Sequence, residues 1–194
     1  MTDARPWTYA ALFGALWGAL EATVGTTLYL ARVPFRGSLI GIAGLLCLIC
    51  LRRLQPRFGV CSLAGVVAIF LKVFTLGGLY PGPVVGIAIQ AVVVDLAMSV
   101  FGNRPVGAAA AGFLVLATNP MQKLTTTWLV AGSDAVRASI ELLEHSAAAI
   151  GLHGIRALPL FLGTVGATGL VGAAAGLWSW RVAGRVRQRL AGQP

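Results

Sequence analysis

The sequence is poor in charge and in chemically reactive side chains. Charged residues make up 11% of its 194 residues, and it contains six acidic side chains, two histidines and three cysteines. A soluble domain of this size carries more charge to cover its surface, so the composition disfavours an ordinary soluble fold. Hydrophobic residues make up 57% of the chain. We therefore expect a single transmembrane domain over residues 1–194.

The reactive side chains are too scattered to predict catalysis. Both histidines, His145 and His153, fall in one polar segment, far along the chain from the cysteines. Nucleophilic catalysis needs a nucleophile and a base at one place, and metal-assisted transfer needs several carboxylates together. The carboxylates within the apolar runs are only two, Glu21 and Asp95. No phosphate-binding glycine motif followed by Lys and Ser or Thr occurs. We predict no enzyme activity, no metal and no cofactor for this chain.

Apolar runs long enough to cross a bilayer recur along the chain. They predict an all-α membrane protein with six transmembrane helices. The predicted spans are about 7–30, 37–51, 59–76, 83–101, 105–130 and 156–180.

The arginines predict the orientation of these spans. Loops on the side of the N-terminus are rich in arginine, and the loops on the other side hold fewer arginines together with acidic residues. Because basic loops stay in the cytoplasm, both termini are placed inside a cell (inner) membrane that the chain crosses several times. The arginines are spread over three loops and a tail with no interleaved aromatic residues, so no nucleic-acid partner is expected. The inner arginines are Arg5, Arg52, Arg53, Arg57, Arg104, Arg181, Arg185, Arg187 and Arg189.

The outer segment 131–155 differs from the other connections. Ser133 can cap a helix, and apolar residues then recur at spacings of four and three. Charged residues occupy the remaining positions, so the segment predicts an amphipathic outer helix between the fifth and sixth spans. It is either a connector resting on the lipid or a lid over the bundle. The recurring apolar residues are Val136, Ile140, Leu143, Ala147 and Ile150.

Small residues predict close helix packing. Cys47, Cys50 and Cys61 are expected to be small core residues. Glycines in the last span promote the close approach of two helix backbones, which drives association in lipid. They are Gly163, Gly166, Gly169, Gly172 and Gly176.

Polar side chains from four spans lie at one predicted depth, in the outer half of the membrane. Charged and polar groups in the bilayer face a bundle interior or a cavity. Two interpretations remain open: a buried ion pair of Glu21 with Lys72 or Lys123, or an outward-facing pocket with a lysine for an anionic ligand. Asp95 lies in the inner half, where a structural partner is expected. The predicted layer contains Glu21, Lys72, Gln90, Asn119 and Lys123, with Trp128 at its mouth.

The first span carries two stripes of small residues. At 100° per residue, one contains Ala11, Ala15, Ala19 and Ala22. The second stripe lies about 90° around the helix axis from the first and contains Gly14, Gly18, Glu21 and Gly25. The glutamate stripe is expected to face inward. The alanine stripe either packs inside the bundle or docks against another protein.

These features resemble the substrate-binding S components of energy-coupling factor (ECF) vitamin transporters. The shared features are six spans, both termini inside, about 190 residues and A-x-x-x-A in the first helix. The resemblance implies that Ala11, Ala15 and Ala19 dock on a transmembrane coupling subunit driven by two ATPases. It also implies a substrate site in the outer loops, which include Arg36 and Tyr80, and in the later helices. The full predicted site is Glu21, Arg36, Lys72, Tyr80, Gln90, Asn119, Lys123 and Trp128.

Two classes of micronutrient fit this expectation. Lys72 and Lys123 suit a small vitamin with a carboxylate or phosphate. A cobalamin-like corrinoid or another metal tetrapyrrole needs an axial donor, for which Tyr80, His145 and His153 are available. The alternatives are an intramembrane enzyme acting on a lipid or isoprenoid, and a structural membrane subunit without a ligand.

Overall fold

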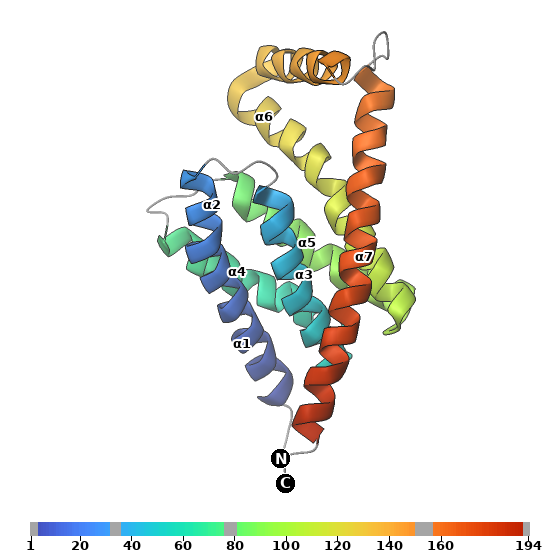
Figure 1. Cartoon of the computed structure of the whole chain (residues 1–194). Helices are drawn as coiled ribbons and strands as arrows, with labels where there is room; N and C mark the ends of the chain where they lie inside the picture. The colour runs from blue at the N-terminus through green and yellow to red at the C-terminus, as the bar shows by residue number, and fades with distance from the viewer. Residues whose placement is uncertain (1–3, 32–35, 76–80, 150–156, 192–194) are drawn as a thin grey trace.

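The computed structural model describes residues 4–31, 36–75, 81–149 and 157–191 (Figure 1). All regular secondary structure in these ranges is helical, which confirms the predicted all-α class. The helices are α1 (Ala4–Leu20), the π-helical turn η1 (Glu21–Gly25), α2 (Thr26–Leu30), α3 (Arg36–Leu54), α4 (Val60–Thr75), α5 (Pro81–Val100), α6 (Pro105–Ala149) and α7 (Ala157–Ala191).

Several of these helices are suited to a bilayer. Four described stretches are long and apolar enough to cross it, and α4 holds a shorter apolar stretch, Val60–Phe74. α3 has 19 residues and is longer than the predicted 37–51 span, because it continues through the arginines at its end. The four long stretches are Pro6–Leu28, Arg36–Leu54, Gly82–Val100 and Leu158–Arg189.

The helices form an up-and-down bundle in which the start of α1 and the end of α7 lie at the same end (Figure 1). α3 also ends there, close to the start of α4 (Figure 1). We call this end the arginine-rich end, because the last turns of α3 and α7 and the turns at 55–59 and 101–104 carry most of the arginines.

α6 contains two helical segments joined at Gly132. The backbone there has φ +80° and ψ −176°, a conformation that glycine adopts without the steric cost that other residues meet. The second segment begins at Ser133, as predicted, and turns away to run toward the start of α7 (Figure 1). Val136 and Ile140 are partly buried, whereas Asp134 and Arg137 are exposed. A helix is therefore present where the amphipathic helix is predicted, at the end of the bundle away from the arginines, and the side chains of Leu143, Ala147 and Ile150 lie outside the described residues.

α6 and α7 touch through their backbones. A Cβ added at Gly112 would lie 2.0 Å from the carbonyl oxygen of Gly172, and one at Gly176 would lie 2.1 Å from that of Ala108. Such close approach maximises van der Waals contact where lipid gives no hydrophobic drive. Gly163 and Gly166, however, meet no atom of the described residues within 4 Å. The prediction of packing for all five glycines was wrong for these two, because the first half of α7 diverges from α6 (Figure 1).

We predict that Gly112→Leu destabilises the protein by about 3 kcal/mol, the upper end of overpacking effects, because the new side chain must separate the α6 and α7 backbones. Thermal unfolding in detergent measures this change. Gly163→Leu is the matched control and should change stability by no more than about 1 kcal/mol. Equal effects at the two positions would contradict the backbone contact.

Candidate functional site

The helices α1, η1 and α2 follow one another without a break and form what we call the first rod. A buried ion pair joins this rod to α4. Lys72 Nζ lies 3.2 Å from Glu21 Oε2 and donates a 2.7 Å hydrogen bond to the backbone oxygen of Glu21. Both residues are buried, at 5% and 8% exposed. Of the two lysines considered from the sequence, Lys72 is thus the partner of Glu21. Lys123 is exposed on α6.

Glu21 begins the π-helical turn, which shifts the backbone hydrogen-bond pattern by one residue and often occurs at functional sites. A Cβ at Gly25, the last residue of this turn, would lie 3.2 Å from Glu21 Oε2 and 3.5 Å from Lys72 Nζ. The absence of a side chain at position 25 therefore leaves room for the ion pair.

Next to this pair, three polar side chains meet the glycine face of α3. Gln90 Nε2 donates a 2.7 Å hydrogen bond to the carbonyl oxygen of Gly41. Asn119 Nδ2 lies 3.7 Å from the position of a Cβ at Gly41. The indole Nε1 of Trp17 and Nε2 of Gln90 lie 2.5 Å and 2.7 Å from the position of a Cβ at Gly44. Helices α1, α5 and α6 thus bring N–H groups to one short stretch of α3.

Two of these donors have no protein acceptor. Trp17 is fully buried, and within the described residues neither its Nε1 nor Asn119 Nδ2 has a hydrogen-bond partner. Buried polar groups are almost always hydrogen-bonded, so unpartnered donors mark a place suited to an acceptor atom from elsewhere. We call Trp17, Gln90 and Asn119 the donor cluster.

Trp17 was not among the residues predicted from the sequence. It precedes Glu21 by four residues and so shares its face of the helix. That spacing is the available signal in the sequence, together with the indole N–H of Trp17, which is a hydrogen-bond donor on an otherwise apolar side chain.

The remaining predicted site residues lie farther out or outside the described residues. Arg36 begins α3 and is exposed, and Trp128 is 57% exposed on α6. Tyr80 and His153 lie outside the described residues. The structure therefore brings Glu21, Lys72, Gln90 and Asn119 into one buried region and leaves Arg36, Lys123 and Trp128 at the surface.

The two stripes of α1 have different surroundings. A Cβ at Gly14 would lie 2.6 Å from the carbonyl oxygen of Ala64, and one at Gly18 would lie 2.8 Å from Leu71 Cδ1. The glycine stripe therefore packs on α4. The alanine stripe faces away: Ala11, Ala15 and Ala19 are all exposed.

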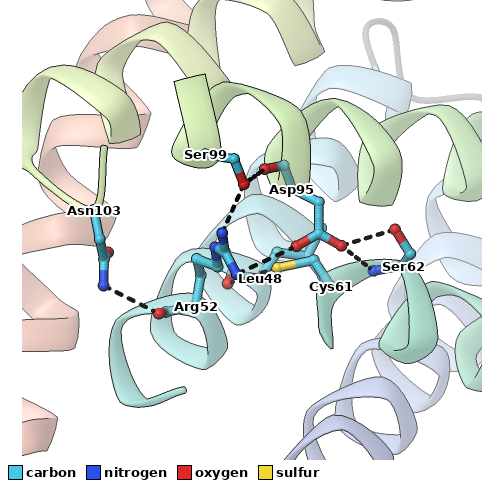
Figure 2. A network of polar contacts seen from close by, with 7 residues as sticks. All are labelled: Leu48, Arg52, Cys61, Ser62, Asp95, Ser99 and Asn103. Atoms are coloured by element: carbon cyan, nitrogen blue, oxygen red, sulfur yellow. Dashed lines mark hydrogen bonds and ion pairs between the residues drawn. The ribbon is translucent and has the colours of Figure 1, made fainter. Parts of the chain in front are cut away.

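A second buried polar network lies nearer the arginine-rich end (Figure 2). Asp95 of α5 is 0% exposed, and its Oδ2 accepts 2.8 Å hydrogen bonds from both the backbone N–H and the hydroxyl of Ser62. Its Oδ1 lies 3.9 Å from Arg52 Nη1. Because Ser62 is in the first turn of α4, the carboxylate caps that helix from a neighbouring one.

Arg52 is held by further contacts in this network. Its Nη2 donates a 2.7 Å hydrogen bond to Ser99 Oγ, and its backbone oxygen accepts one of 3.3 Å from Asn103 (Figure 2). Asp95 therefore has the structural partners that its depth predicted, and the network joins α3, α4 and α5.

The cysteines and acids of the described residues form no further centre. Cys47, Cys50 and Cys61 are buried and free, consistent with small core residues. In the ranges that the structure describes, no three His, Cys, Asp or Glu side chains lie close enough to hold a metal ion.

Comparisons with known proteins give no family. No family model, curated protein or solved structure matches the chain. The geometry of the donor cluster and of the α1 stripes is therefore the basis for a functional proposal.

We predict that Asp95→Asn lowers stability by about 3 kcal/mol, because it leaves Arg52 as a buried charge without its partner. Thermal unfolding of the purified protein measures the loss. Adding Arg52→Gln should restore part of it, since no buried charge then remains. Asp134→Asn, at an exposed acid, is the control and should have no effect. Full stability of Asp95→Asn would contradict a structural role for the network.

Proposed function

We propose that this chain is the membrane-embedded substrate-capture subunit of an ATP-driven importer of the ECF type. The observation that carries the proposal is the separation of the two small-residue faces of α1. Gly14 and Gly18 are buried against α4, whereas Ala11, Ala15 and Ala19 remain open to the surroundings. A small-residue stripe lets another helix approach closely. The alanine stripe is therefore proposed to dock on a transmembrane coupling subunit that ATPases drive.

In this proposal the chain crosses the inner membrane six times. The arginine-rich end lies in the cytoplasm, since basic loops stay on that side. Glu21, Lys72 and the donor cluster then lie toward the outside. The second segment of α6 lies at the outer interface between the fifth and sixth spans.

The substrate is proposed to be a vitamin or a related micronutrient that binds at the donor cluster. Trp17 Nε1 and Asn119 Nδ2 suit acceptor atoms of a small ligand. Lys72 is engaged by Glu21, whereas Lys123 is exposed toward the same end, where Arg36 also lies. A carboxylate or phosphate of the ligand would meet Lys123. This favours a small anionic vitamin over a corrinoid, whose axial donor would come from Tyr80, His145 or His153.

We predict that Ala15→Leu abolishes uptake of the substrate and leaves its binding unchanged. The added side chain projects from an exposed face, so it blocks docking without disturbing the bundle. Uptake is measured in cells that contain the coupling subunit, and binding is measured on the purified chain. Ala167→Leu, at an exposed alanine of α7, is the matched control. Normal uptake by Ala15→Leu would refute the docking role.

We predict that gently purified protein retains a small molecule, and that Trp17→Phe weakens its retention about 3- to 10-fold through the loss of one hydrogen bond. Native mass spectrometry identifies the retained mass and compares the variants. Trp178→Phe, at an exposed tryptophan near the other end of the bundle, is the control. Equal retention by Trp17→Phe would contradict the donor cluster, and a ligand-free mass after soaking with a panel of vitamins would contradict substrate capture.

A further inference from the structure

The arginine-rich end holds much more positive charge than the described carboxylates balance. Within the described ranges, the single carboxylate at this end is Asp95, which is buried and engaged by Arg52 and Ser62. The other described acids lie toward the opposite end of the bundle. This end is therefore suited to an anionic partner. Its further arginines are Arg53, Arg57, Arg104, Arg181, Arg185, Arg187 and Arg189.

The depth of these arginines relative to the bilayer points to the kind of partner. The apolar stretch Leu158–Arg189 has 32 residues, or about 48 Å at 1.5 Å per residue, against a hydrocarbon core of about 30 Å. Trp178 is 53% exposed and is the last of the exposed large apolar side chains of α7. Tryptophan favours the membrane–water interface. Arg181 follows about 4.5 Å beyond it and so lies among the lipid headgroups.

Arg53, in the last turn of α3, is held against this part of α7 by several contacts. Its guanidinium lies 4.0 Å from the centre of the Trp180 ring and donates a hydrogen bond to the backbone oxygen of Trp180. Its Nη1 lies 2.6 Å from the position of a Cβ at Gly184, so the group lies directly against the helix. Arg187 follows Gly184 by three residues and therefore lies on the same face of α7 as the Arg53 contact. Two neighbouring guanidinium groups with no described carboxylate beside them are suited to bind one phosphate together. The planar set of N–H donors on each arginine matches the spacing of phosphate oxygens.

We propose that Arg53 and Arg187 bind the phosphate of an anionic phospholipid at the arginine-rich end, and that Arg181 and Arg185 add positive charge at the same level of α7. We assign the phosphate to a lipid and not to a free anion because of its level along α7. The site begins where the apolar surface of α7 ends, at the level of the headgroups. Clusters of arginine just beyond a membrane helix recognise such lipids. This inference depends on insertion in a membrane and not on transport, so it stands or falls separately from the proposed function.

The test is native mass spectrometry of the full chain in micelles that contain equal amounts of phosphatidylglycerol and phosphatidylcholine. We expect the chain to retain phosphatidylglycerol selectively. The variant Arg181→Gln/Arg185→Gln/Arg187→Gln should reduce this selectivity more than about tenfold. Its three side chains are exposed, so the fold is retained. Arg137→Gln, at an exposed arginine of the opposite end, is the matched control and should retain the lipid.

Three outcomes would overturn the proposal. Equal retention of the two lipids would show that the protein does not recognise the charge of the headgroup. Unchanged selectivity in the triple variant would show that the lipid binds elsewhere. Thermal stabilisation by inorganic phosphate equal to that by phosphatidylglycerol would make the ligand a free anion. Selective retention that the triple variant loses, and that inorganic phosphate does not reproduce, supports the lipid site.

Discussion

A charged side chain in the interior of a bilayer needs an opposite charge or hydrogen bonds beside it, and this requirement determines how the helices of this protein are joined. The Glu21–Lys72 pair connects the first rod to α4, and the Arg52–Asp95 network connects α3, α4 and α5. α4 takes part in both, at opposite ends of its length. This helix, whose apolar stretch is shorter than the four long ones, is thereby fixed to its neighbours at two levels.

The electrostatics around Glu21 and the donor cluster differ from those of a simple cationic pocket. The ammonium of Lys72 is engaged by both the carboxylate and the backbone oxygen of Glu21. What remains available at depth is neutral: the indole N–H of Trp17 and the amide N–H of Asn119. The cations Arg36 and Lys123 lie farther out. In the proposed capture of a substrate, this arrangement would order the ligand with its neutral polar atoms at the donor cluster and its charge toward Arg36 and Lys123.

The sequence predicted the apolar helices, the break before Ser133, the inward face of Glu21 and the structural role of Asp95. These features depend on composition, periodicity and local backbone chemistry, which are properties of single segments. The choice of Lys72 over Lys123, the donor role of Trp17 and the open space at Gly163 were not predicted. Each depends on which helix lies opposite, and periodicity describes the faces of a helix without identifying their neighbours. The sequence left two alternatives for the alanine stripe, packing inside the bundle or docking on another protein; its exposure favours the second, and the partner remains a proposal.

The π-helical turn at Glu21–Gly25 has a consequence for the first rod as a whole. A π turn holds about one residue more than an α turn, so the helical register before it and after it differs by one position, or about 100° of rotation. The faces of α2 are therefore turned by about 100° from the positions that a uniform α-helix would give them, although α1 and α2 belong to one continuous rod. Spacings of three and four residues counted from the glycine stripe of α1 consequently do not predict which residues of α2 face the bundle.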